Sequence, residues 1–299
     1  MGISNSVSRA RPLLGTFVEI SAGGASHVAV EAAVDRAFAA VEQIHRLMSF
    51  HDPASDVGRL NREAASRAVT VHSLTSAVLE AALDLHRRSS GVFDITVAPL
   101  LQERGLLPKH DGRPPHRPAA AARGVAIELL SGQRVCYAHP GVVIDLGGIA
   151  KGFAVDRAIA ALRESGVTHG VVNAGGDLFA FGTPVAVDLR DPRDFGRTLC
   201  RVTLHDEALA SSGGRFDPLA ATAPATSAVI NPATGRAAVV AGASVAAPTC
   251  MIADALTKVV MIAGEAAGPL LDHFRARALM VAADGTVNAT SDWRVDLAA

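Results

Sequence analysis

The chain has 299 residues with 28 basic and 29 acidic side chains, and this balance, without a long run of either sign, argues against a nucleic-acid-binding surface. Hydrophobic residues make up 49% of the sequence and aromatics only 4%, which predicts a globular protein with an aliphatic core. The three cysteines, Cys136, Cys200 and Cys250, are far apart and form no CxxC pair, so the sequence encodes neither a disulfide framework nor a structural zinc site.

The amino terminus carries no sign of a targeting segment. Residues 1–20 lack the basic start and the continuous apolar stretch of a secretory signal. No later segment has the ~20 uninterrupted apolar residues of a membrane span. We therefore expect a cytoplasmic monomer or homodimer without a membrane span, or a periplasmic protein if a leader was trimmed from the sequence.

Regular structure is expected from residue 16 onward. Thr16–Ser21 alternates like a strand, and residues 30–48 carry the apolar stripe of an amphipathic helix behind Ser26, a candidate N-cap. A second helix is expected over Ser73–Arg88. Charged residues and several prolines predict a surface loop or flap over residues 102–124.

The second half of the chain mixes strands and helices without a strict βαβ alternation. This order predicts an α+β fold, a single compact domain over residues 1–299 with mixed sheets flanked by helices. The expected elements are a buried strand at 141–146, a helix at 150–164, a strand, Gly-Gly turn and strand at 171–182, a helix at 250–264 and a hairpin at 278–289.

The first candidate site is the junction from Asp145 to Gly152, which reads DLGGIAKG. Its paired glycines allow close approach of a ligand just before a helix amino terminus, which can hold an anion such as phosphate. The junction has neither the GxGxxG spacing of a dinucleotide fold nor the GK[ST] of a P-loop. The glycines could instead serve helix-on-sheet packing.

A second Gly-Gly pair lies in VNAGGD, residues 172–177, directly after an apolar run. Asn173 and Asp177 could line a cleft there, although Asn and Asp beside glycines are also common turn formers.

The third candidate site lies in ADALTK, residues 253–258, where Asp254 and Thr257 fall on one face of a helix. Hard oxygen donors of this kind suit magnesium, which binds one or two carboxylates together with water and substrate phosphates. Asp254 could instead simply stabilise the first turn of its own helix.

Eight blocks of sequence, spread over nearly the whole chain, occur in the order found in one protein family. They are PLLGT at 12–16, MSFH at 48–51 with Ser55 and Leu60-Asn61, GVFDITV at 91–97, DLGGIAKGFAVD at 145–156, NAGGD at 173–177, Ser212-Gly213, NPATG at 231–235 and ADAL at 253–256. In these blocks the chain resembles the ApbE-like FAD:protein FMN transferases. The resemblance implies an ApbE-like fold related to the T-fold.

The resemblance implies an enzyme that binds FAD and Mg²⁺ and transfers FMN to a Ser or Thr hydroxyl of a target flavoprotein, with release of AMP. It places the metal at the Ala150 carbonyl and the Asp254 carboxylate, with Thr257 as a further candidate ligand. Lys151 would add positive charge at the helix start, or else face solvent; with Asp254 it forms the predicted catalytic pair. The implied flavin and adenine contacts are Leu14, His51, Val92, Phe93, Asp94, Gly147 and Phe153.

One departure from the family pattern concerns the proton acceptor. Ala228 and Asn231 stand where family members usually have His and Asp. Losing a general base typically slows a reaction by about 100- to 10,000-fold. His51, His169 or Asp94 could take its place.

A second departure is Lys258, which stands where many relatives have a metal-binding Thr. Its ammonium could partly replace the cation or point into solvent, while Thr257 could retain the metal.

These departures leave three functions open. The leading one is the FMN transferase; the others are an FAD carrier or sensor that has lost transfer activity, and an FAD pyrophosphatase that releases FMN and AMP. A nicotinamide dehydrogenase is disfavoured, because its glycine fingerprint and downstream acidic residue are missing.

Overall fold

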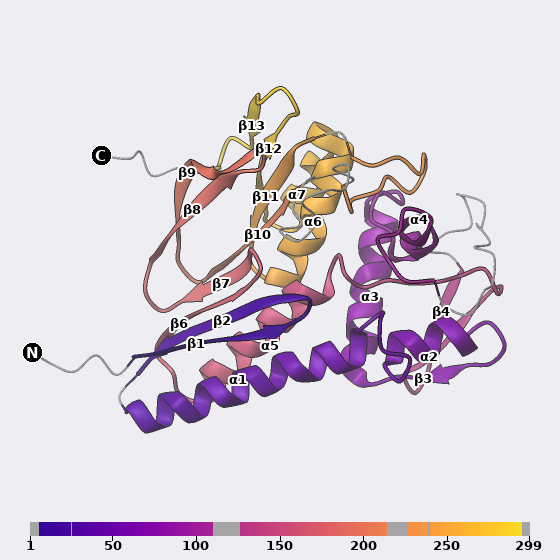
Figure 1. The fold of residues 1–299 in the computed structure, drawn as a ribbon, viewed down its shortest axis with the longest axis horizontal. Helices are drawn as coiled ribbons and strands as arrows, with labels where there is room; N and C mark the ends of the chain where they lie inside the picture. Colours follow the sequence, from indigo (N-terminus) through magenta and orange to yellow (C-terminus); the bar gives the residue numbers. More distant parts are fainter. Residues whose placement is uncertain (1–5, 25, 110–125, 214–226, 239, 295–299) are drawn as a thin grey trace, which may run out of the picture.

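The structure, a computed structural model, describes residues 6–24, 26–109, 126–213, 227–238 and 240–294. Figure 1 shows two neighbouring parts: a large sheet with helices packed on it, and a smaller group of helices and short strands beside it. Segments from both parts line the cavity that forms the candidate site.

An eight-stranded sheet in the order β1-β2-β6-β7-β10-β11-β12-β13 forms the larger part. All of its pairings are antiparallel in the described residues. The α+β class is therefore confirmed, with antiparallel sheets in place of the mixed sheets expected. The strands are β1 Ser6–Leu13, β2 Thr16–Gly23, β6 His169–Ala174, β7 Asp177–Phe181, β10 Glu207–Gly213, β11 Gly242–Ala247, β12 Arg277–Val281 and β13 Val287–Ala289.

Three helices pack against this sheet: α1 His27–Met48, α5 Ala150–Glu164 and α6 Cys250–Ala263 (Figure 1). The apolar stripe predicted within residues 30–48 is buried, as expected for an amphipathic helix. Ser26 occupies the N-cap position of α1 but makes no side-chain capping hydrogen bond. The amino-terminal ends of α5 and α6 lie close together, since Asp156 of α5 accepts from the first two amides of α6.

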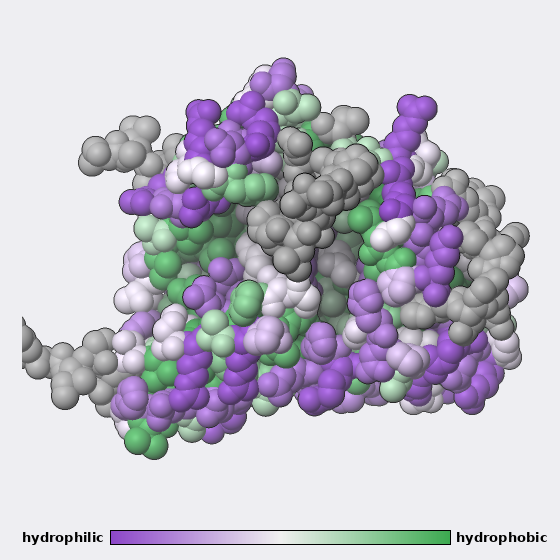
Figure 2. Space-filling view, in the orientation of Figure 1, coloured by the Kyte–Doolittle hydropathy of each residue, from purple (hydrophilic) through white to green (hydrophobic). Residues whose placement is uncertain are grey.

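The outer face of α1 is charged and pairs with β1. Arg9 bridges Glu31 at 2.8 Å and Asp35 at 3.0 Å, and Arg11 bridges Asp35 at 3.0 Å and Glu42 at 3.2 Å. Figure 2 shows the same edge of the molecule as mostly hydrophilic. These half-exposed pairs fix the hairpin β1–β2 over α1, but each contributes little to stability because water screens it.

A two-stranded hairpin covers part of the opposite face of the sheet. It consists of β8 Val185–Asp191 and β9 Asp194–Leu204. Leu189 of the hairpin packs with Leu178 and Leu209 of the sheet in a small second core. The sheet is therefore covered on both faces at β7 and β10, by the hairpin on one side and by α5 and α6 on the other.

The smaller part packs helices around a short three-stranded sheet. Its elements are α2 Asp56–Glu63, β3 Val69–Thr70, α3 Ser73–Arg88, the 3₁₀ turn η1 Ile95–Val97, α4 Ala98–Glu103, β4 Ile127–Leu130 and β5 Arg134–Tyr137; the 3₁₀ turn η3 Gly264–Ala267 and α7 Gly268–His273 follow α6 in the larger part.

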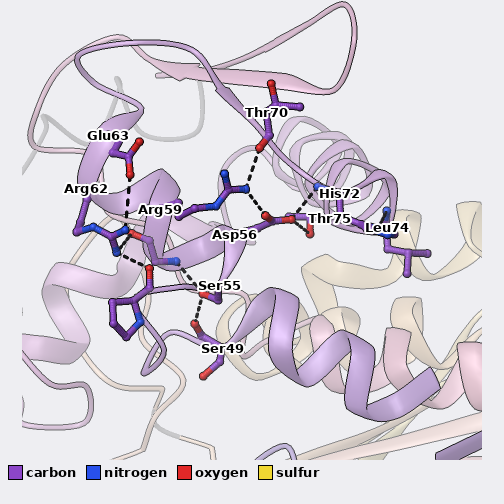
Figure 3. A network of polar contacts seen from close by, with 12 residues as sticks. Ser49, Ser55, Asp56, Arg59, Arg62, Glu63, Thr70, His72, Leu74 and Thr75 are labelled. Carbon is purple, nitrogen blue, oxygen red and sulfur yellow. Dashed lines mark hydrogen bonds and ion pairs between the residues drawn. The ribbon is translucent and has the colours of Figure 1, made fainter. Parts of the chain in front are cut away.

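A buried carboxylate ties α2 to α3. Asp56 is 5% exposed and accepts hydrogen bonds from the His72 amide at 2.8 Å and the Thr75 hydroxyl at 2.7 Å, while Arg59 pairs with its other oxygen (Figure 3). Arg59 also donates to the Thr70 carbonyl at 2.8 Å. A charged acceptor shared by several donors fixes the turn between the two helices.

Replacing Asp56 by alanine is expected to lower the free energy of unfolding by about 2–4 kcal/mol, because the buried Thr75 hydroxyl and His72 amide lose their acceptor. Urea unfolding measures this loss. The matched control is Asp84→Ala, since Asp84 pairs with Arg88 on a partly exposed helix surface and such pairs contribute at most about 1 kcal/mol. Equal losses in the two variants would contradict the anchoring role of Asp56.

The strand predicted at residues 141–146 is not formed. Val142, Ile144 and Leu146 are buried as the pattern indicated, but the segment joins no sheet. Its backbone is satisfied elsewhere: Asn61 of α2 accepts from the Ile144 amide at 2.8 Å and donates to the Ile144 carbonyl at 2.9 Å, and the Asp145 amide donates to Ile95. The Asn61 side chain thus supplies the hydrogen bonds that a neighbouring strand would have made if residues 141–146 had formed the predicted strand.

The other expected elements are confirmed. The strand from Thr16 is β2, the helices are α1, α3, α5 and α6, and the two hairpins are β6–β7 and β12–β13. Most of the surface loop expected at 102–124 falls in residues 110–125, outside the described part of the chain. Within the described residues, no helix is long and apolar enough to cross a membrane.

Candidate functional site

A cavity of about 360 Å³ lies at the amino end of α5, between the larger and smaller parts. Apolar side chains form most of its wall, and two lysines and two aspartates supply charge. The lining residues are Val92, Phe93, Asp94, Ile95, Val97, Leu101, Leu106, Leu107, Asp145, Gly147, Gly148, Lys151, Ser212, Gly213, Ala228, Val229, Ile230, Pro232, Lys258 and Ile262.

The floor of the site is the close contact between α5 and α6. A Cβ atom on Gly152 would lie under 3.0 Å from the Cys250 carbonyl and from Asp254, so only glycine lets the two helices approach this far. Asp156 of α5 accepts from the Cys250 amide at 2.7 Å and the Met251 amide at 2.9 Å, which caps α6. Burial raises the pKa of Asp156 to about 6.

Four charged side chains meet above this contact. Asp254 is fully buried; one of its oxygens pairs with Lys258 and lies 3.8 Å from Lys151 Nζ, and the other accepts from the Gly152 amide at 3.1 Å. Lys151 also pairs with Asp177, which is fully buried at the start of β7. The carboxylates are 0% exposed, while the lysine side chains are 18% and 30% exposed. Both lysines line the cavity, whereas Asp254 and Asp177 do not.

The surroundings shift the pKa values of these groups in different directions. Burial opposes charge on Asp254, but the two lysines outweigh burial and lower its pKa. Burial and the charge of Asp254 raise the pKa of Asp177 despite its contact with Lys151. Burial alone would lower the pKa of Lys151, but Asp177 and Asp254 raise it. Asp254 and Lys151 are therefore held in their charged forms.

The predicted metal ligands Ala150, Asp254 and Thr257 are not among the residues that line the cavity. Ala150 begins α5 and Thr257 is fully buried in α6. Thr257 donates to the Asp254 backbone carbonyl at 2.7 Å, and its hydroxyl lies 2.7 Å from that of Ser212. Because Thr257 is the donor in the first contact, Ser212 donates in the second, which leaves the Thr257 hydroxyl engaged on both sides.

This donor set does not fit a resident divalent cation. Magnesium needs free oxygens, whereas both oxygens of the Asp254 carboxylate already have donors and two ammonium groups lie within 3.8 Å of one of them. Lys258 also donates to the Asp254 carbonyl at 3.0 Å. The described residues contain no group of three or more His, Cys, Asp or Glu that could hold a metal. Magnesium binding at Ala150, Asp254 and Thr257 stays a prediction, and the pairing of Asp254 with two lysines disfavours it.

Four of the seven predicted flavin and adenine contacts line the cavity: Val92, Phe93, Asp94 and Gly147. They come from the segment between α3 and η1 and from the turn before α5. Asp94 caps η1, since its Oδ1 accepts from the Thr96 amide at 2.8 Å and hydroxyl at 2.7 Å.

The other three predicted contacts do not line this cavity. Leu14 occupies the tight turn between β1 and β2 with a positive φ of 57°, and its amide donates to His45 at 3.2 Å. Phe153 is half-buried on α5 and packs against the main core. His51 is exposed, and its proximity to Asp145 lowers the pKa of that carboxyl, against the larger effect of burial.

Position 228, where the family pattern has its proton acceptor, carries no base in this chain. Ala228 lines the cavity and offers no base. Within the described lining the carboxylates are Asp94 and Asp145; burial raises the pKa of Asp145, although backbone donors and His51 oppose the shift. His169 begins β6, at the end of that strand away from Asp177, so it does not replace the missing base.

The pairing of Lys151 with Asp177 is the feature that the sequence did not reveal. The sequence predicts a cleft or turn role for Asp177 and Asn173, and Asn173 does stabilise the turn by accepting from the Gly176 amide at 3.0 Å. One signal was present: Asp177 opens the apolar run of β7, where a buried carboxylate needs a partner.

Comparison with known proteins adds a consistent result. A family model described as the ApbE family matches residues 14–281. An FAD:protein FMN transferase of Vibrio cholerae is 27% identical over 276 residues, covering 86% of this chain and 81% of the relative. One from Rhodobacter capsulatus is 29% identical over 312 residues, covering 98% of this chain but only 58% of the relative. The crystal structure of an ApbE protein from Thermotoga maritima superposes with a TM-score of 0.81 at 25% identity, covering 96% of this chain and 97% of that one.

Proposed function

The chain belongs to the ApbE family, and on this premise we propose that it is an FAD:protein FMN transferase, which moves FMN from FAD to a Ser or Thr hydroxyl of a target flavoprotein and releases AMP. Relatives that carry this activity in their names align with most of the chain. The acceptor protein and its Ser or Thr are part of the proposal.

The observation that carries the proposal is the cavity at the amino end of α5. Gly147 and Gly148 leave room for close approach of a ligand, and Lys151 and Lys258 bring positive charge to the same wall. A helix amino terminus adds favourable N–H dipoles for an anion. Apolar side chains from η1 and α4 line the same cavity. A ligand with a pyrophosphate and a flavin ring matches both kinds of wall.

In this reaction the acceptor oxygen bonds to the FMN phosphorus of FAD, and the bond between that phosphorus and the bridging oxygen breaks. AMP leaves with the bridging oxygen, and the hydroxyl proton passes to a base or to solvent. The protein contributes position and charge neutralisation, which dominate phosphoryl transfer. Asp94 and Asp145, the described carboxylates of the cavity wall, are the candidate proton acceptors.

Three incubations separate the possible activities. The protein is mixed with FAD alone, with FAD and an acceptor fragment, or with neither, and both AMP and acceptor mass are followed. A transferase releases AMP only with the acceptor and in equal amount to labelled acceptor. Release of AMP without acceptor would instead identify a pyrophosphatase, and tight FAD binding with no AMP in any mixture would identify a carrier.

The variant Ala228→His is expected to raise the rate of acceptor labelling at least tenfold, because a positioned base contributes about 100- to 10,000-fold. FAD affinity should not change. Single-turnover labelling measures the rate, and Ala233→His, in the exposed turn after Pro232, serves as the control. An unchanged rate in Ala228→His would show that another group already accepts the proton.

A further inference from the structure

We propose that the Lys258 ammonium supplies the positive charge for the phosphates of FAD in this chain, in place of a divalent cation, so that FAD binding does not require magnesium. This inference rests on the proposed function for the identity of the ligand.

Lys258 occupies the oxygens that a cation would need. It lies one helical turn after Asp254, pairs with the Asp254 carboxylate and donates to the Asp254 carbonyl at 3.0 Å. An ammonium is a compact point charge with three donors, so it can bind several oxygens as a small cation does. A divalent ion at the same oxygens would be repelled by both Lys258 and Lys151.

The same side chain reaches the cavity wall beside the Gly-Gly turn. Lys258 lines the cavity and is 18% exposed. A Cβ added to Gly148 would lie 3.6 Å from Lys258 Cε and 3.8 Å from the ring of Phe93. The lysine stem therefore lies beside the Gly-Gly turn, whereas its partner carboxylate is fully buried and does not line the cavity.

The use of lysine here is selective. Only three of the 28 basic residues are lysines, Lys109, Lys151 and Lys258, and two of these three meet at Asp254. Arginine, which provides all the other basic residues of the chain, has a wide planar head, whereas the lysine ammonium is compact. Two lysines on one carboxylate indicate a site that requires a compact positive charge.

Binding measurements test the proposal directly. FAD affinity is measured by fluorescence titration in EDTA and in millimolar Mg²⁺, for the wild type, Lys258→Thr and Lys258→Met. We expect the wild type to bind equally in both buffers. Lys258→Thr should lose at least about tenfold in affinity in EDTA and regain it with Mg²⁺, whereas Lys258→Met should lose affinity in both, since it offers neither charge nor an oxygen. Lys109→Thr, at an exposed position, is the matched control.

A second measurement uses the metal alone. Mn²⁺ titration followed by electron paramagnetic resonance should show one bound ion in Lys258→Thr and none in the wild type. Wild-type affinity that falls at least tenfold in EDTA, or Mn²⁺ bound by the wild type, would overturn the proposal. Neither the FAD titration nor the Mn²⁺ titration requires transfer. A missing transferase activity would therefore refute the proposed function, whereas the two titrations would still decide whether Lys258 replaces the cation.

Discussion

Replacing Asp254 by asparagine is expected to reduce FMN transfer by about 100- to 1,000-fold, the loss typical when a group that fixes charge in an active site is removed. Asp254 is the common partner of Lys151, Lys258 and the Gly152 amide. A neutral amide cannot hold both ammonium groups in place. The phosphates of FAD would then bind beside Lys151 and Lys258 side chains that are no longer held in one position.

The same variant should also lose about 3–5 kcal/mol of unfolding free energy, because two partly buried ammonium groups lose their shared carboxylate. Transfer is therefore measured without urea, at a temperature well below the unfolding midpoint of the variant. Asp272→Asn, at an exposed position of α7, is the control. Transfer by a folded Asp254→Asn protein at the wild-type rate would show that this cluster has no part in the reaction.

The variant Gly152→Ala is expected to destabilise the fold by about 3 kcal/mol, near the upper end of overpacking costs. The added Cβ would press on the Cys250 carbonyl, which is backbone and cannot rotate away. Moving α5 from α6 also breaks the Gly152 to Asp254 hydrogen bond, so FAD affinity should fall with stability.

Thermal unfolding and FAD titration measure the two effects of Gly152→Ala. The matched control is Gly268→Ala, because Gly268 has open space around its Cα and helical angles. Alanine there should be neutral or stabilise the protein by up to about 1 kcal/mol. Similar behaviour of the two variants would mean that the contact between α5 and α6 is looser than described.

The sequence predicted the helices better than the strands. The amphipathic patterns of α3 and α5 fixed their bounds, because burial of one helix face repeats over several turns. The segment 141–146 has an equally apolar pattern, but its hydrogen bonds go to Asn61, which is about 80 residues away in sequence. The short strands of the smaller sheet were not predicted, since two to four residues carry little periodic signal. The hairpin β8–β9 was also not predicted, although its strands have 7 and 11 residues; most residues of β9 are exposed, so that strand lacks a regular buried face.

The sequence predicted individual residues of the site but not the contacts between them. Asp254, Lys151 and the Gly-Gly turn each stood out from local spacing. The pairing of Lys151 with Asp177 depends on where β7 lies relative to α5, which no local pattern specifies. For Lys258 the sequence left two orientations open, and the structure directs the ammonium to Asp254 rather than to solvent.

The central claim is that this chain transfers FMN to a protein, and intact mass spectrometry of an acceptor tests it most directly. A panel of flavoprotein fragments is incubated with FAD and the protein, with and without Mg²⁺, beside parallel reactions with the Vibrio cholerae relative. We predict that at least one fragment gains the mass of one FMN on a Ser or Thr, with an equal amount of AMP. Fragments that the relative labels but that remain unmodified by this protein under every condition would contradict the claim.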